Sequence, residues 1–243
     1  MKSLPDFLLL DLDDTILDYT APGERCWEKL CVSFAPKVDP ISAEQLWAAI
    51  DQSRQWFWSD PERYRRWSLD LKSARRLILA RAFSLLQADN LKVSEEIADA
   101  FTTLREEMVQ PFPGSVETLR TLHDRGIHMG LITNGSAEFQ RAKVRRFELE
   151  QYFDFVLIEG EFGVGKPDPR VFKHGLDQFG APPEQAWMIG DNLEFDIRPA
   201  QELGMDTVWV NYARNSLPDN SPVQPTRMIY ALTELIEAAW QTE

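Results

Sequence analysis

The chain has 243 residues, enough for one large domain or two smaller ones, and its 44% apolar and 27% charged content is usual for a globular protein. A net charge of −13 argues against a general nucleic-acid binder and against a protein that binds anionic membranes. The first apolar run ends at Asp11, which is too short for a signal peptide or a membrane span, so we expect a cytoplasmic protein.

The first expected element is a strand over residues 7–10, a wholly apolar run that suits burial on both faces. It leads into Asp11-Leu12-Asp13-Asp14-Thr15. Because alternate side chains of an extended chain share a face, Asp11 and Asp13 can point the same way. Two carboxylates that close repel each other unless a cation lies between them. A capped turn is the simpler interpretation, since Asp and Thr favour turns and helix N-caps.

Residues 24–108 are expected to be helical, because apolar residues recur there at three-to-four-residue spacing. We predict four or more helices packed as a bundle, followed by a return linker at residues 110–114. Cys26 and Cys31 lie five residues apart in this block. They are expected to be reduced packing thiols on different faces of one helix.

The charge of one part of this block runs against that of the whole chain. Residues 51–81 hold eight basic and four acidic side chains, a local balance of +4. Aromatic residues are interleaved with them, namely Trp56, Phe57, Trp58, Tyr64 and Trp67. One interpretation is a surface that attracts an anionic substrate and stacks on a flat group such as a nucleobase or a flavin ring. The other is a bundle with aromatic core residues and solvated arginines.

Beyond residue 114 the expected helices and strands alternate. Helices are predicted at 115–125, 136–147, 168–180, 195–203 and 232–240, and strands at 127–133, 155–158, 186–189 and 207–210. This alternation is typical of an α/β fold, a doubly wound parallel sheet with helices on both faces. We therefore place an α/β core domain at residues 1–17 and 110–243, with an all-helical domain, residues 18–109, inserted after the first strand.

Polar side chains follow four of these strands. In strand order they are Asp11 and Asp13, then Thr133 and Asn134, then Lys166, then Asp191, Asn192 and Asp196. Ligands of parallel sheets bind outside the carboxyl ends of the strands, so these groups should meet at one edge. Carboxylates suit Mg²⁺, an ionised Asp can attack without a separate base, and an ammonium with a hydroxyl can hold phosphoryl oxygens. Alternatively, Lys166 is only a structural counter-charge to the carboxylates.

The four stretches resemble the four motifs of the haloacid dehalogenase (HAD) superfamily in their order and separation. The inserted helical block resembles the cap domain that the helical-cap group of this superfamily carries after its first motif. The resemblance extends over nearly the whole chain. It implies a Rossmann-like core, a Mg²⁺ cofactor and chemistry on the first aspartate.

Carried over to the first motif, the resemblance implies that Asp11 is the nucleophile that becomes an aspartyl-phosphate. Asp13 resembles the acid/base that protonates the leaving oxygen and then activates water, and its main-chain carbonyl would touch Mg²⁺. Asp14 stands where the family often has Gly or Asn. Thr15 is interpreted as a turn residue that bonds to the backbone.

In the other motifs, Thr133, Asn134 and Lys166 are implied to bind the substrate phosphate, and Thr133 and Lys166 to be part of the catalytic set. Asp191 matches the direct metal ligand. Asp196 matches the second acid of the fourth motif, which acts through water or a neighbour, or else only stabilises a helix end. Asn192, in the fourth motif, has two interpretations: it is a helix cap, or it holds a metal-bound water.

The three histidines, His123, His128 and His174, share no spacing with these motifs and are expected to be structural or surface residues. The resemblance therefore predicts a Mg²⁺-dependent phosphatase that hydrolyses a small anionic phosphate monoester through an intermediate on Asp11. A phosphomutase of the same superfamily and a non-catalytic binding module are alternatives. A 2-haloacid dehalogenase is disfavoured, because dehalogenases need no leaving-group acid and lack an Asp at the position of Asp13. A nucleotide, a sugar phosphate and flavin mononucleotide all fit as substrate.

Overall fold

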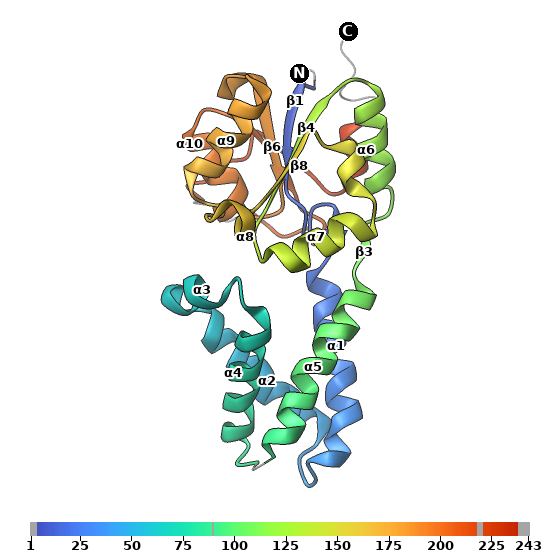
Figure 1. Cartoon of the computed structure of the whole chain (residues 1–243), viewed down its shortest axis with the longest axis vertical. Helices are drawn as coiled ribbons and strands as arrows, with labels where there is room; N and C mark the ends of the chain where they lie inside the picture. The colour runs from blue at the N-terminus through green and yellow to red at the C-terminus, as the bar shows by residue number, and fades with distance from the viewer. Residues whose placement is uncertain (1–3, 89, 218–220, 238–243) are drawn as a thin grey trace. The chain divides into compact units, whose positions relative to one another are not determined.

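The computed structural model describes residues 4–88, 90–217 and 221–237 (Figure 1). The chain divides into two compact units. The core unit comprises residues 1–18 and 110–243, and the helical unit comprises residues 19–109. The helical unit is thus an insertion between two segments of the core unit.

The core unit is built on a six-stranded sheet in the order β5-β4-β1-β6-β7-β8, in which every neighbouring pair is parallel. The strands are β1 (Phe7–Leu10), β4 (His128–Thr133), β5 (Phe155–Ile158), β6 (Ala186–Gly190), β7 (Asp206–Val210) and β8 (Arg227–Ile229). β1 lies in the middle, with Leu10 opposite Leu131 on one side and Ile189 on the other. Its apolar run is buried on both faces, which is why it reads as a continuous apolar stretch. The predicted α/β fold class is confirmed.

Helices cover the sheet, as Figure 1 shows for α6, α9 and α10. They are α6 (Ser115–Asp124), α7 (Ala137–Arg146), α8 (Glu159–Phe162), α9 (Pro169–Phe179) and α10 (Arg198–Glu202). Local sequence explains the ends of α9: the Asp168 side chain accepts from the backbone N–H of Arg170, and Gly180 closes the helix in the left-handed conformation.

Two of the predicted helices differ from the structure. The expected helix at 195–203 is a π-helical turn, η4 (Leu193–Ile197), followed by the short α10, whose Pro199 lies in the first turn. The expected helix at 232–240 is a single 3₁₀ turn, η5 (Leu232–Leu235), and residues 238–240 lie outside the described residues. β8 was not predicted, because three residues after a Pro-containing loop carry no periodicity.

The two connections to the helical unit pair with each other. β2 (Leu17–Asp18) and β3 (Gln110–Pro111) form a two-stranded antiparallel ladder within the core unit. The segment predicted as a return linker, residues 110–114, is therefore hydrogen-bonded in part to the segment that leads into the helical unit. Ile16 adds two further bonds, since its carbonyl accepts from the N–H of Phe112 at 3.0 Å and from Ser115 Oγ at 2.9 Å.

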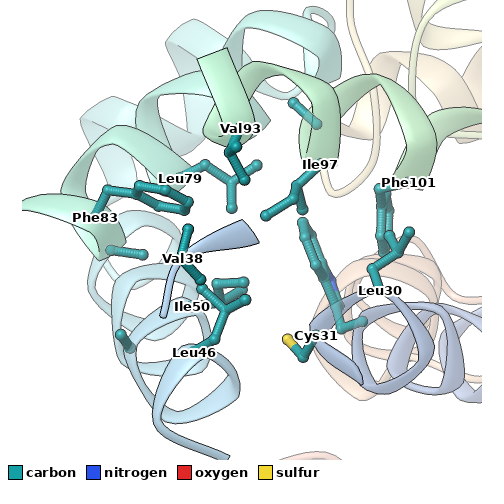
Figure 2. Packing of buried hydrophobic residues seen from close by; sticks show 14 of the residues in the cluster. Leu30, Cys31, Val38, Leu46, Ile50, Leu79, Phe83, Val93, Ile97 and Phe101 are labelled. Atoms are coloured by element: carbon teal, nitrogen blue, oxygen red, sulfur yellow. The ribbon is translucent and has the colours of Figure 1, made fainter. Parts of the chain in front are cut away.

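The helical unit contains α1 (Thr20–Phe34), α2 (Ala43–Trp58), α3 (Pro61–Trp67), α4 (Leu71–Leu85) and α5 (Leu91–Met108), in agreement with the predicted bundle. Figure 2 shows Leu79 and Phe83 of α4 and Val93 and Ile97 of α5 lying around one interior with Leu46 and Ile50 of α2. Cys26 and Cys31 are free and buried in α1, as predicted. A bilayer crossing would need a longer and more apolar helix than any that the described residues form.

Candidate active site

The turn after β1 places the first aspartates. The N–H of Asp11 donates to Ile189 O at 2.9 Å, so Asp11 continues the pairing of β1 with β6 and its carboxylate leaves the sheet at its carboxyl edge. The chain then turns tightly, with the N–H groups of Ile16 and Leu17 both donating to Leu12 O. Asp14 has φ +60°, the left-handed region in which Gly, Asn and Asp are the tolerated residues. The turn geometry thus explains the Asp where the family often has Gly or Asn.

Three carboxylates and one ammonium meet at this edge. Single oxygens of Asp11, Asp191 and Asp196 all lie within 4.8 Å of one another. Nζ of Lys166 lies 2.5 Å from Asp11 Oδ1 and 2.6 Å from Asp196 Oδ1. Asp11, Lys166 and Asp196 are buried, whereas Asp191 is half-buried. We call these four residues the aspartate–lysine cluster.

The end of β6 supports the cluster through its backbone. Trp209 Nε1 donates to Asp191 O at 2.7 Å, and the N–H of Asn192 donates to Asp196 Oδ2 at 3.0 Å. A Cβ on Gly190 would lie 2.4 Å from Asp196 Cγ, so only glycine lets that carboxyl fold back against the strand. The side chain of Asn192 accepts from two N–H groups of η4, which is the capping role that was one of its two readings.

The electrostatics of the cluster disfavour a full set of ionised carboxylates. Burial raises the pKa of Asp11 from 3.8 to about 7. Attraction to Lys166 opposes this rise, and repulsion from Asp196 adds to it. Burial and repulsion from Asp11 and Asp196 raise the pKa of Asp191 to about 9. Burial alone would lower the pKa of Lys166, but its attraction to Asp11 and Asp196 outweighs burial and raises that pKa. Three carboxylates share one ammonium, and a further cation would relieve their repulsion.

The donor set of the cluster fits a hard divalent cation. All the available ligand atoms are carboxylate oxygens, with the backbone carbonyls of the turn nearby in sequence. Mg²⁺ is bound in proteins by one or two carboxylates together with waters and substrate phosphate oxygens, and it does not need an all-protein cage. The residues present are therefore suited to Mg²⁺.

The loop that carries Lys166 is held by Asn134. The Asn134 side chain accepts from the Lys166 N–H at 2.7 Å and donates to Lys166 O at 2.7 Å. A Cβ on Gly165 would come within 2.7 Å of Asn134 Oδ1, so glycine is needed for this close approach. The Asn134 amide is thus engaged in orienting Lys166, a role that sequence reasoning did not assign to it.

A second network joins Asp13 to the end of β4 through α7. Lys143 Nζ lies 2.6 Å from both carboxylate oxygens of Asp13, and Gln140 Nε2 donates to Asp13 Oδ2 at 3.1 Å. The same Gln140 nitrogen donates to Thr133 Oγ1 at 2.6 Å and to Asn134 O at 2.6 Å. Gln140 is buried and Lys143 half-buried. Both were missed in the sequence, where the only signal was their i, i+3 spacing on a basic helix that follows Thr133.

The remaining polar residues considered in the sequence are Thr15 and the three histidines. Thr15 Oγ1 donates to the side chain of Asp11, at 3.3 Å from Oδ2, whereas a bond to the backbone was predicted. His123 and His128 are exposed, and His128 Nδ1 lies 2.9 Å from Asp154 Oδ2. His174 packs against the ring of Phe162. The three histidines are structural or surface residues, as predicted.

A six-stranded parallel sheet with the aspartate–lysine cluster at its carboxyl edge defines a Rossmann-like α/β fold with a candidate catalytic site. Residues 5–204 match the family model of the haloacid dehalogenase-like hydrolases, and the chain belongs to that family.

The chain is similar to two phosphatases of known name and to one solved structure of the same family. The chain is 38% identical to a phosphoserine phosphatase from Thermus thermophilus over 146 residues, covering 60% of this chain but only 57% of that protein. It is 30% identical to a glyceraldehyde 3-phosphate phosphatase from Pyrococcus abyssi over 212 residues, 85% of this chain and 82% of that one. The magnesium-bound HAD-hydrolase YfnB from Bacillus subtilis has a similar fold, with TM-score 0.72, 23% identity and coverage of 94% and 96%.

Proposed function

We propose that the chain is a Mg²⁺-dependent phosphatase that hydrolyses a small phosphate monoester through an aspartyl-phosphate on Asp11. The observation that carries the proposal is the aspartate–lysine cluster, with a second carboxylate, Asp13, two residues from the nucleophile. The relatives named as phosphatases of phosphoserine and of glyceraldehyde 3-phosphate support a small phosphorylated substrate. We propose a cytoplasmic location, consistent with such a metabolite.

The first half-reaction transfers the phosphoryl group to the protein. An oxygen of the Asp11 carboxylate attacks phosphorus, the bond from phosphorus to the ester oxygen breaks, and Asp13 donates a proton to that leaving oxygen. In the second half-reaction Asp13 takes a proton from water, and the water oxygen attacks phosphorus. The bond to Asp11 breaks, which releases inorganic phosphate and restores both carboxyl groups.

The other cluster residues hold charge. Asp11, Asp191 and the main-chain carbonyl of Asp13 would bind Mg²⁺. Asp196 would hold Lys166 in place beside them through its ion pair with the Lys166 ammonium. When bound, Mg²⁺ supplies positive charge to the carboxylates and to the phosphoryl oxygens. Lys166 also balances the negative charge that the phosphoryl group brings next to Asp11, and it is already 2.5 Å from that carboxylate.

Thr133, with Asn134, is proposed to hold a phosphoryl oxygen. Its hydroxyl oxygen accepts from Gln140, which leaves the hydroxyl hydrogen to donate, and its own bond to Asn134 O is long at 3.4 Å. Gln140 and Lys143 are proposed as positioning residues, since their three bonds hold the Asp13 carboxylate against α7. This arrangement orients the acid/base before substrate binds.

The helical unit is proposed to act as a cap, with hinges near residues 17–23 and 110–114. A cap that closes would limit the access of water to the phosphorylated intermediate and would contribute substrate selectivity. The paired strands β2 and β3 keep the two connecting segments together, so both would move as one ribbon.

Asp13 also discriminates between the alternatives. A dehalogenase expels halide, which needs no proton, whereas an alkoxide leaving group does need one. A phosphomutase would return the phosphoryl group to a sugar instead of to water. Incubation with a hexose phosphate and its bisphosphate distinguishes a phosphomutase from a phosphatase. Only a phosphomutase forms the isomeric monophosphate without releasing phosphate.

The test is hydrolysis of p-nitrophenyl phosphate by the purified chain. Asp11→Asn should lower kcat on the order of a thousandfold or more, because it removes the nucleophile. EDTA should silence the wild type, and added Mg²⁺ should restore it. Asp177→Asn, the same change at an exposed position on α9, is the matched control. Turnover by Asp11→Asn at the wild-type rate would rule out the covalent mechanism, and full activity in EDTA would rule out the metal.

A further inference from the structure

The helical unit has an open pocket of about 420 Å³ within its own fold. The pocket lies among the end of α2, α3 and α4, and its walls include Trp56, Arg63, Trp67, Leu77, Arg81 and Leu85. Its volume is in the range of pockets that bind small molecules. All of these residues belong to the helical unit.

Two arginines lie against one indole ring in this pocket. The guanidinium carbon of Arg63 is 3.9 Å and that of Arg81 is 4.1 Å from the centroid of Trp56. Arg63 is anchored, since it donates to Trp56 O at 2.6 Å and to Phe57 O at 3.1 Å. Its charge also lies 3.5 Å from Asp60. Arg63 is therefore largely satisfied by the protein.

Arg81 is held differently. Its Nε is buried and has no hydrogen-bond partner, and no carboxylate among the described residues lies within ion-pair distance of its guanidinium. A charged donor withdrawn from water without an acceptor costs free energy, and such donors are usually paired. The indole face stabilises the cation but offers no acceptor for its N–H groups. The pocket thus contains a cation that lacks an oxyanion.

The rest of the wall is apolar and accessible. Trp56, Leu77 and Leu85 are 41%, 43% and 44% exposed, unusually high for large apolar side chains that share one hollow. Ser84 adds a hydroxyl. An inorganic ion would satisfy Arg81 but would leave this apolar surface uncovered, whereas a neutral apolar molecule would leave Arg81 without a partner.

We propose that this pocket, the Trp56–Arg81 pocket, binds a small organic anion. A carboxylate or phosphate group of the ligand accepts from Arg81 and Ser84, and its flat or apolar body lies against Trp67, Leu77 and Leu85. The proposal does not depend on the catalytic mechanism, because all of its contacts lie in the helical unit.

The test uses ¹⁹F NMR of 4-fluorobenzoate titrated with the whole chain, with neutral 4-fluorobenzyl alcohol as the uncharged probe. The wild type should bind 4-fluorobenzoate, and Arg81→Gln should weaken it about tenfold or more, because a charge-assisted pair is lost. Arg76→Gln is the matched control: it makes the same charge change on the same helix, at a side chain that is 56% exposed. It should alter the affinity less than twofold.

A second variant guards against misfolding. Leu85→Glu sets a carboxylate at the exposed wall of the pocket without touching the core, and repulsion should weaken 4-fluorobenzoate but not 4-fluorobenzyl alcohol. Thermal unfolding confirms that each variant is folded. Failure of the wild type to bind 4-fluorobenzoate, or equal affinity in the wild type and in folded Arg81→Gln and Leu85→Glu, would overturn the proposal. If the wild-type chain does not hydrolyse p-nitrophenyl phosphate, the proposed function fails, but the proposal of an anion-binding pocket still stands or falls on the 4-fluorobenzoate result.

Discussion

Replacing Lys166 by Met tests whether one ammonium holds the buried carboxylates together. Met keeps the length and apolar body of the side chain and removes only the charge. Lys166 is 3% exposed and lies within 2.6 Å of the carboxylates of Asp11 and Asp196, which are 8% and 1% exposed. The variant therefore leaves the three carboxylates of the aspartate–lysine cluster facing one another without a counter-charge.

The expected cost is large. Removing one partner of a buried ion pair typically costs about 3–5 kcal/mol, because the remaining charge stays desolvated. Part of this is recovered when Asp11 and Asp191, whose pKa values are already raised, take up protons. No other ammonium or guanidinium of the described residues pairs with the carboxylates of Asp11 and Asp196, so Mg²⁺ should stabilise Lys166→Met by more than it stabilises the wild type.

Native-state hydrogen exchange of peptides that cover β1 and β6 measures the free energy of opening of the core unit alone, which matters in a chain of two units. It is compared in EDTA and in Mg²⁺. Lys173→Met, at an exposed position on α9, is the control and should change the free energy by less than about 0.5 kcal/mol. The reasoning fails if both variants lose equally little in EDTA, or if Mg²⁺ stabilises wild type and Lys166→Met to the same degree.

Three further predictions follow from the same geometry. The pKa values in the folded protein are about 7 for Asp11 and about 9 for Asp191, above the ordinary 3.8. The metal-free protein should therefore lose stability as pH rises from 4 to 9, because the folded state favours the protonated carboxyls. A melting temperature in EDTA that rises with pH over this range would contradict the prediction. Lys143→Met should lower kcat by about 10- to 100-fold with KM nearly constant, because it frees the acid/base carboxylate; an effect on KM alone would argue otherwise. Gly190→Ala should displace Asp196, cost about 1–3 kcal/mol of stability and weaken Mg²⁺ binding in calorimetry; unchanged affinity would refute it.

Most of the core fold was predictable because local apolar runs mark five of the six strands of the sheet, all but β8. The apolar run before Asp11 and the alternation of helices and strands after residue 114 reflect burial, which a parallel sheet imposes on every strand. The weak points were short elements. β8 and η5 span three or four residues, and at that length packing against the rest of the sheet decides the conformation, not periodicity.

The residues of the candidate site could be proposed from the sequence, but their ion pairs could not. Motif residues at strand ends pointed to Asp11, Lys166 and Asp191, and parallel topology explains why they meet. Gln140 and Lys143 were not predicted, because an i, i+3 spacing on a basic helix is common and does not by itself indicate a contact with Asp13. Their contacts with Asp13 span 127 and 130 residues.

Local sequence identifies the residues that could do chemistry and the strand end at which each one stands, since burial and turn preferences act over a few residues. The pairing of the charges becomes apparent only in the folded chain. Lys166 pairs with Asp11 and Asp196, Lys143 pairs with Asp13, and Arg81 has no oxyanion within the described chain. Ion pairing depends on distances of a few ångströms between segments far apart in the chain, and those distances exist only after the chain has folded.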